Sequence, residues 1–328
     1  MEQKYMIGLD IGGTKCAAIL GRIRCPEGES PIMDKIKFDT EVKKGYEQAI
    51  AHFFDAIDEL MRRNGIQKEE IKAAGISCGG PVDSRQGLIL SPPNLVGWDR
   101  VPITKLVTDR YGFPAYLQND ANACAVAEWK YGAAQGCSNV IFLTMGTGMG
   151  AGLILDGHLY SGANDMAGEA GHVRLHSYGP AGYGKAGSFE GFCSGGGTAR
   201  LASTRVLEHI QRGEKPELCP DLASLELLDC RRLGEFARRG DKLSLSIWKE
   251  AGQWLGRGVA MLVDILNPEL VVIGSVYERC GEFLAPSMQE VLQQECLPLS
   301  LAACKVVPAH LGDAIGDYAA LGVALLEI

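Results

Sequence analysis

A strand, a carboxylate and a glycine turn follow one another in residues 7–20, IGLDIGGTKCAAIL, and this order limits the folds open to the chain. The first apolar run ends at Asp10, and a second begins after the turn GGTK at residues 12–15. Because glycines have no Cβ, their backbone N–H groups can surround a phosphate chain. A carboxylate at the strand end suits Mg²⁺, directly or through water. The alternative is a plain tight hairpin, in which glycines are equally common.

A second turn of this kind lies in residues 140–155, where TMGTGMGAG separates two apolar runs. Thr14 and Thr147 can add hydroxyl donors to the two turns, and Lys15 can add a positive charge. Neither turn has the G-x-x-x-x-G-K-[ST] pattern of a P-loop or the G-x-G-x-x-G pattern of a dinucleotide fold. Two strand pairs around glycine turns indicate two similar α/β halves, although the chain has no periodic repeat.

Strand-like and helix-like patterns alternate along the rest of the chain, which is typical of an α/β fold. The pattern restarts after residue 115, and this restart indicates a second unit. Gly65 is expected to end the first helix as its C-cap. We expect strands at residues 71–78, 115–120 and 268–277, and helices at residues 46–65, 121–134, 313–328 and, with a polar interruption, 196–266.

Composition excludes several classes of protein. The 328 residues are enough for two domains, and 46% apolar and 22% charged residues describe a globular chain. A formal charge of −8 without a basic block argues against a nucleic-acid surface. The first ten residues lack a leader pattern, and no apolar run is long enough to span a membrane. The 11 scattered cysteines are typical of reduced thiols, so we expect a cytoplasmic protein.

The segment LQNDANACAVAE, residues 117–128, is the candidate catalytic motif. Asp120 or Asn122 could cap a helix that begins near Ala123. The functional alternative is that Asp120 accepts a proton from a substrate hydroxyl while Asn119 orients that hydroxyl. An alcohol is a poor nucleophile at neutral pH, and a carboxylate within hydrogen-bond reach can activate it.

A third cluster, GANDMAGEAGHVRLHS at residues 162–177, places Asp165, Glu169, His172 and His176 among glycines. Glu169 and His172 could point into one space and bind vicinal hydroxyls. The alternative is a histidine that is satisfied within the core. The glycine-rich setting favours a site.

Together these motifs resemble the ROK family, the bacterial sugar kinases and sugar-responsive repressors within the actin/hexokinase-like ATPases. The resemblance covers nearly the whole chain and rests on motifs in order and spacing: IGLDIGGTK, GGPVD, SPPNLVGW, NDANACAVAE, TMGTGMGAGLILDG, AGEAGHV and FEGFCSGGG. It implies an α/β fold with two ribonuclease H-like (actin-like ATPase) domains and an interdomain cleft. The N-terminal domain would span residues 1–117, completed by a C-terminal helix at about 312–328, and the C-terminal domain, with a large helical portion, residues 118–311.

The same resemblance implies roles for individual residues. Asp120 matches the catalytic base, and Ser275 replaces a glycine that is usual beside the adenosine-binding turn. The sugar-binding positions are matched by Asn94, Asn119, Glu169, His172 and Glu190. The nucleotide-binding positions are matched by Asp10, Gly12, Gly13, Thr14, Lys15, Thr144, Gly146, Thr147, Gly148 and Gly274.

The activity implied is ATP-dependent phosphorylation of a hexose, with glucose at its 6-hydroxyl as first choice and Mg²⁺ held by Asp10 through water. Mannose, fructose, allose, N-acetylglucosamine and N-acetylmannosamine are alternative substrates, and a non-catalytic sugar-sensing regulator is an alternative function. The family's repressors carry a DNA-binding region before the first phosphate motif, whereas nine residues precede Asp10 here, which favours a kinase. We expect a homo-oligomer, a dimer, that binds neither nucleic acid nor membrane.

One departure from the family concerns zinc. Most relatives with this glutamate carry a motif C-x-C-G-x-x-G-C-x-E whose cysteines, with the histidine, bind a structural Zn²⁺. Alignment on Glu190 places residues that are poor zinc ligands at the three cysteine positions: Ala181, Tyr183 and Ser188. A substitute set of His172, His176 and Cys193 has no paired cysteine spacing to support it. We therefore predict no zinc and a loop 177–190 held by packing around Tyr178, Tyr183 and Phe189.

Overall fold

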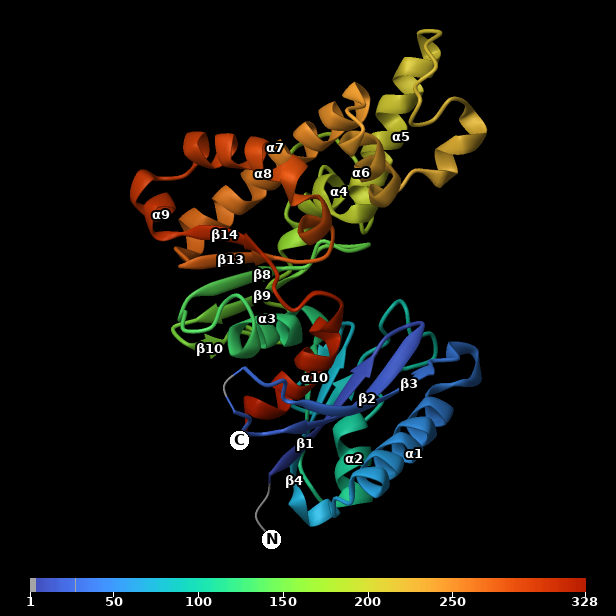
Figure 1. Cartoon of the computed structure of the whole chain (residues 1–328), viewed down its shortest axis with the longest axis vertical. Coiled ribbons are helices and arrows are strands. Elements are labelled where there is room, and N and C mark those ends of the chain that lie inside the picture. The colour runs from blue at the N-terminus through green and yellow to red at the C-terminus, as the bar shows by residue number, and fades with distance from the viewer. Residues whose placement is uncertain (1–3, 27) are drawn as a thin grey trace.

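The computed structural model describes residues 4–26 and 28–328 and has two lobes, each built on a five-stranded sheet (Figure 1). The strand order is β3-β2-β1-β4-β7 in the N-terminal lobe and β10-β9-β8-β13-β14 in the C-terminal lobe. In both sheets the first three strands along the chain pair antiparallel, and the last two add in parallel. The two lobes therefore share one topology, as the two glycine-turn hairpins predicted.

Strands and helices of the N-terminal lobe alternate along the chain. Gly65, with a left-handed φ of 67°, ends the first helix as predicted. Helix α1 buries one face, including Ile50, Phe53 and Ile57, against the sheet. The elements are β1 (Tyr5–Ile11), β2 (Lys15–Arg22), β3 (Ile32–Asp39), α1 (Tyr46–Asn64), β4 (Ile71–Cys78), the hairpin β5 (Val82–Asp83) and β6 (Leu88–Ile89), α2 (Ile103–Tyr111) and β7 (Ala115–Asn119).

The C-terminal lobe adds a large helical layer to its sheet, as Figure 1 shows. Its strands are β8 (Val140–Leu143), β9 (Ala151–Leu155), β10 (His158–Leu159), β13 (Leu270–Ile273) and β14 (Lys305–Pro308), with a small hairpin of β11 (Ala181–Gly182) and β12 (Lys185–Ala186). Its helices are α4 (Phe189–Cys193), α5 (Gly195–Gln211), α6 (Cys230–Arg238), α7 (Lys242–Leu266), α8 (Val276–Glu295) and α9 (Pro298–Ala303). The interruption expected within residues 196–266 lies between α5 and α6.

Two helices exchange between the lobes. Helix α3 (Asp120–Tyr131) follows β7 but packs against β8 and β9, and α10 (Ile315–Leu325) follows β14 but packs against β1 and β4. Gly75 of β4 allows this approach, because a Cβ there would lie 2.1 Å from the carbonyl oxygen of Ala320. The helices also contact each other, so the lobes meet where the chain crosses between them (Figure 1). From this arrangement we propose lobe boundaries near residues 117 and 312.

Three further expectations can be compared with the structure. The N-cap of α3 is Asn119, whose side chain accepts from the N–H of Asn122 at 2.9 Å, so the capping role suggested for Asp120 or Asn122 was wrong. All eleven cysteines are unpaired. Among the described residues no helix is long and apolar enough to cross a membrane, and the leader argument rests partly on residues 1–3, which lie outside them.

Candidate active site

The first glycine turn joins β1 to β2 and places Asp10 beside helix α10. The turn is tight, because a Cβ on Gly12 would lie 2.6 Å from the carbonyl oxygen of Lys15. The backbone of α10 also approaches closely, since a Cβ on Gly316 would lie 2.7 Å from Oδ2 of Asp10. Thr14 and Lys15 are exposed at the tip of the turn. The predicted phosphate motif therefore forms one compact turn with Asp10 at its base.

Asp10 lies in a region of concentrated negative charge. Burial raises its pKa to about 6, and the charges of Asp317 and Asp120 add to the rise. Lys37 and Lys35 oppose it only in part. Carboxylates that share a site in this way are stabilised by a bound cation. Asp10 therefore fits the Mg²⁺ role predicted for it.

The second glycine turn joins β8 to β9 and borders a pocket of about 360 Å³. The hydroxyl of Thr144 accepts from the N–H of Gly150 at 2.9 Å and so fastens the base of the turn. The start of α5 contributes two glycines, and the N–H of Gly195 donates to the carbonyl oxygen of Gly146 at 2.7 Å, which joins the helix to the turn. The pocket is lined by Gly146, Thr147, Gly195, Gly196, Ala199, Asp229, Cys230, Arg231, Ser275 and Val276.

The predicted adenosine turn contributes to this pocket through its second residue. Gly274 is buried, and a Cβ there would lie 3.2 Å from the ring of Phe142, whereas Ser275 lines the pocket. Ser275 has a φ of 60°, a backbone conformation that glycine adopts far more readily. Its N–H donates to the carboxylate of Glu278 at 2.5 Å, which stabilises the turn. A glycine, which the family resemblance implies at this position, would adopt this conformation without strain.

Asp120 opens helix α3 directly after β7. Its Oδ1 accepts from the N–H of Ala121 at 2.8 Å. The residue is exposed to solvent, yet protein atoms surround its carboxylate on most sides, and the resulting desolvation raises its pKa. A carboxylate with a raised pKa is a better proton acceptor than one in free solution.

The predicted sugar-binding side chains gather around Asp120. Burial raises the pKa of Glu169, the charge of His172 opposes the rise, and the charges of Asp120 and Glu190 add to it. These four side chains are therefore close enough to interact electrostatically. Glu190 also accepts from the N–H of Met149 at 3.0 Å, which joins α4 to the second glycine turn.

Asn94 lies against the first glycine turn. A Cβ on Gly13 would be 2.8 Å from both the Cβ and the carbonyl oxygen of Asn94. Gly148 is constrained less strictly, because its Cβ would be 2.8 Å from Oε2 of Glu190, the end of a side chain that can move aside. At Gly146 the nearest atom is the Ser275 hydroxyl at 3.9 Å, so this glycine has open space toward the pocket. Each turn thus contacts a predicted sugar residue, and the second turn also borders the pocket.

The packing predicted for loop 177–190 is only partly right. Phe189 is fully buried, but Tyr178 and Tyr183 are 79% and 80% exposed. The aromatic support comes instead from Phe192, whose ring stacks on Trp254 at 3.8 Å.

Polar contacts complete the loop. Ser188 is buried as the N-cap of α4, where its hydroxyl accepts from the N–H of Gly191 at 3.1 Å. Lys185 donates to the carbonyl oxygen of His172 at 2.8 Å.

Within residues 4–26 and 28–328 no three His, Cys, Asp or Glu side chains are grouped as metal ligands. The zinc-free state stays a prediction that metal analysis must test.

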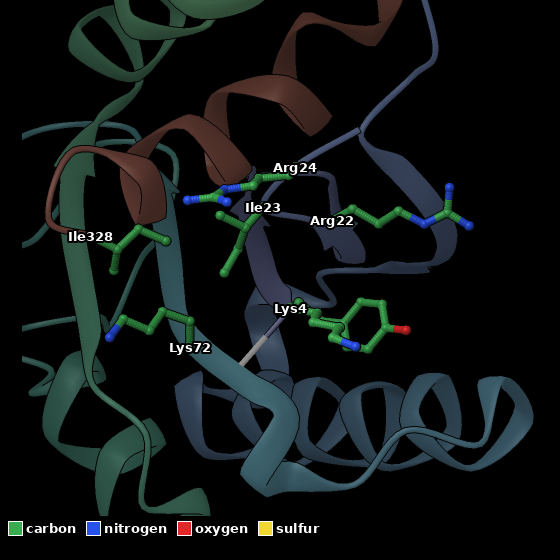
Figure 2. A pocket seen from close by; sticks show the side chains of 7 residues that line it. Lys4, Arg22, Ile23, Arg24, Lys72 and Ile328 are labelled. Atoms are coloured by element: carbon green, nitrogen blue, oxygen red, sulfur yellow. The ribbon is translucent and has the colours of Figure 1, made fainter. Parts of the chain in front are cut away.

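A larger cavity lies outside this site. It has a volume of about 580 Å³ and is found at the start of β1, the opposite end of the strand from Asp10 (Figure 2). Its lining carries basic side chains around two isoleucines, and Arg22 points away from the side where Arg24 and Lys72 lie (Figure 2). We therefore assign it no part in the site.

Several residues of the site were missed by the sequence analysis. Gly195 and Gly196 follow the motif FEGFCS directly, so the glycine run was a usable signal. Asp229 and Arg231 are far from any glycine turn in the sequence, and Asp317 lies in an apolar helix. No local pattern links these three to the turns, because only the fold brings them together.

Known proteins similar to this chain include sugar kinases and sugar-responsive repressors. The model of the ROK family matches residues 6–327. A glucokinase from Thermotoga maritima is 31% identical over 99% of this chain and 97% of its own length. A ROK family glucokinase from Streptomyces griseus, solved in complex with glucose and AMPPNP, is 29% identical with a TM-score of 0.74, covering 98% of this chain and 99% of that one. A xylose repressor from Caldicellulosiruptor bescii is 27% identical over 94% of this chain and 75% of its own length.

Proposed function

Because this chain belongs to the ROK family, we propose that it transfers the γ-phosphate of ATP to a hexose, with glucose at the 6-hydroxyl as the first candidate. The Thermotoga glucokinase and the Streptomyces glucokinase with glucose and AMPPNP support this choice of substrates. The expected residue roles, the cytoplasmic location and a homodimer belong to the same proposal.

The observation that carries the proposal is the position of Asp120. Its charge interacts with Asp10, at the base of the first glycine turn, and with Glu169, in the predicted sugar cluster. A carboxylate between a phosphate turn and a hydroxyl-binding cluster is placed to act on a hydroxyl that attacks a phosphate. General base catalysis of that attack is the chemistry this arrangement suits.

The proposed mechanism assigns a task to each group. Backbone N–H groups of the two glycine turns surround the phosphates, and the pocket beside Ser275 takes the adenosine. Glu169, His172 and Asn119 orient the sugar hydroxyls. Asp120 then accepts the hydroxyl proton as the oxygen attacks the γ-phosphate in line.

Asp10 would hold Mg²⁺ through water, consistent with the excess negative charge around its carboxylate. When bound, the ion neutralises charge on the phosphate oxygens. The protein's own contribution is to place Asp10 beside the turn, where Lys35 and Lys37 offset only part of the burial and carboxylate charge that raise its pKa, so a bound cation would favour the ionised form.

A non-catalytic sugar-binding regulator is the second candidate. The similarity to the xylose repressor favours this candidate, since the match covers 94% of this chain. Such a protein would bind the sugar through Glu169 and His172 without needing Asp120 as a base.

ADP release from ATP distinguishes the two candidates. We would test glucose, mannose, fructose, allose, N-acetylglucosamine and N-acetylmannosamine in parallel in a coupled assay. Sugar-dependent ADP release supports the kinase, and the sugar with the highest kcat/KM identifies the substrate. Sugar binding by calorimetry without any ADP release would support the regulator.

A further inference from the structure

The loop that carries Glu169 is bonded directly to the N-terminal lobe. The N–H of Ser84 donates to Oδ2 of Asp165 at 2.7 Å, and its hydroxyl donates to Oδ1 at 2.8 Å. Arg85 adds a longer bond of 3.5 Å to the carbonyl oxygen of Gly162. Between residues 28–117 and 133–308, which the structure describes throughout, these are the hydrogen bonds that join the two lobes.

Ser84 is fixed to the N-terminal lobe. It lies in the turn between β5 and β6, where the Asp83 carboxylate accepts from the N–H of Gln86 at 2.9 Å and from its side-chain amide at 2.7 Å. Val82 and Ile89 anchor the hairpin in the core of that lobe. Ser84 therefore moves with the N-terminal lobe as one body.

Asp165 is fixed to the C-terminal lobe. Three residues later, the carbonyl oxygen of Gly168 accepts from the N–H of Ala151 in β9 at 2.8 Å. Asp165 itself has a φ of 62°, in the left-handed region that favours glycine. A residue other than glycine persists in such a conformation where its surroundings hold it there, which is common at functional sites. Here the two bonds from Ser84 hold it.

We propose that Asp165 is a positioning residue that ties the sugar-facing loop to the N-terminal lobe and so stabilises the closed arrangement of the lobes. The inference rests on the proposed kinase function. Asp165 lies four residues before Glu169 in the same loop, so the contact that joins the lobes also fixes the sugar cluster relative to Asn94 and the first glycine turn of the N-terminal lobe. Closure of this kind excludes water, which competes with the sugar as a nucleophile.

The test uses the full chain and the variant Asp165→Gly. Glycine suits the φ of 62° at residue 165, so Asp165→Gly removes the carboxylate while the loop can keep its backbone conformation. The matched control is Asp156→Gly in the β9–β10 turn. Asp156 is also left-handed, with a φ of 50°, but its turn belongs wholly to the C-terminal lobe.

We expect Asp165→Gly to raise the KM for the sugar about tenfold, which corresponds to about 1.4 kcal/mol. That is the order of a hydrogen bond to a charged group. The KM for ATP and kcat at saturating sugar should not change, since bound sugar compensates for the lost contact. A merely structural role would instead lower the active fraction, and with it kcat, and leave both KM values alone.

Small-angle X-ray scattering without ligands gives a second readout. The radius of gyration should rise in Asp165→Gly and stay unchanged in Asp156→Gly. The scattering measurement needs neither sugar nor ATP. If no sugar is phosphorylated, the sugar affinity measured by calorimetry takes the place of KM. The absence of phosphorylation would therefore count against the kinase function alone. An unchanged radius of gyration, or an unchanged sugar KM or affinity, in Asp165→Gly would overturn the positioning role.

Discussion

Glu128 allows a direct test of how the exchanged helices are held together. Its side chain is fully buried, and its carboxylate accepts three backbone N–H bonds. Oε2 accepts from Ala133, after α3, at 2.7 Å. Oε1 accepts from His310 at 2.9 Å and from Leu311 at 3.0 Å, between β14 and α10. One carboxylate therefore joins α3 to the segment that leads into α10.

The size of the effect follows from the number of donors. Glu128→Ala removes the partner of three backbone N–H groups, two on the half-buried Ala133 and Leu311 and one on the exposed His310. An N–H group shielded from water costs about 1–3 kcal/mol when it loses its partner, so the two half-buried groups lead us to expect the free energy of unfolding to fall by about 2–6 kcal/mol, a large share of the 5–15 kcal/mol that is usual for a protein. Glu128→Gln keeps one acceptor oxygen but turns an amide donor toward a backbone N–H. The free energy of unfolding should therefore fall less in Glu128→Gln, by about 1–3 kcal/mol.

Urea unfolding measures these losses, and Glu269→Ala is the control. Glu269 also accepts backbone N–H bonds, from Ser138 at 2.6 Å and Asn139 at 2.7 Å, but its side chain is exposed. Water can replace the Glu269 carboxylate there, so we expect the free energy of unfolding to fall by less than about 1 kcal/mol. If Glu128→Ala lost no more stability than Glu269→Ala, the carboxylate would not be what holds the exchanged helices.

Four further predictions concern the site. Asp120→Asn should bind ATP normally and lose kcat by about 10²-fold or more; near-normal turnover would leave Asp120 without a role as base. Gly146→Val should weaken nucleotide binding measured by calorimetry and spare sugar binding, whereas Gly148→Val should weaken both; equal profiles would contradict the geometry of the turn. The pKa of Asp10 is raised from an ordinary 3.8 to about 6 in the folded protein. The free energy of unfolding therefore falls as the pH rises through the range between these two values, because Asp10 ionises less readily in the folded state. Asp10→Asn should therefore raise the melting temperature of the ligand-free protein at pH 7.5, with little gain at pH 4, and lose Mg²⁺-dependent ATP binding; an equal gain at both pH values would reject this reasoning. Metal analysis of protein purified without chelator should find no zinc, and about one Zn²⁺ per chain would refute that prediction.

Much of the fold could be predicted because its signals are local. Gly65 ends α1 as expected, and the two glycine-turn hairpins appear at equivalent places in the two sheets. Apolar runs such as residues 71–78 become buried central strands, whose composition differs sharply from that of the flanking loops. Features of this kind depend on a few consecutive residues, so they can be recognised without knowing the tertiary structure.

Other elements gave weaker signals or depended on distant contacts. The edge strand β3, IMDKIKFD, has four charged residues among eight and no fully buried one, so it lacks the apolar run of a central strand, and no strand was predicted there. The exchange of α3 and α10 depends on Gly75 lying against Ala320, far apart in the sequence. The same is true of Ser84 and Asp165. Long-range partners of this kind leave no periodic pattern.

Loop 177–190 shows how packing arguments fail in glycine-rich segments. Tyr178 and Tyr183 are the large side chains of the loop, so they were expected to fill its interior. Instead Gly187 lies so close to the chain that a Cβ there would be 1.9 Å from the carbonyl oxygen of His176. The backbone itself fills the interior, which leaves no room for the tyrosine rings.

The two glycine turns also connect the predicted sugar and nucleotide sites. The backbone of Gly13 lies against Asn94, and Gly148 lies against Glu190, which also accepts the N–H of Met149. The two contacts differ in kind. At Gly13 the near atoms include the backbone of Asn94, so a side chain there would have to displace the main chain. At Gly148 the near atom is the end of the Glu190 side chain, so a larger residue would push aside a carboxylate that the N–H of Met149 holds in place. Gly13 is therefore required by the packing of the two segments, whereas Gly148 keeps a predicted sugar ligand in position.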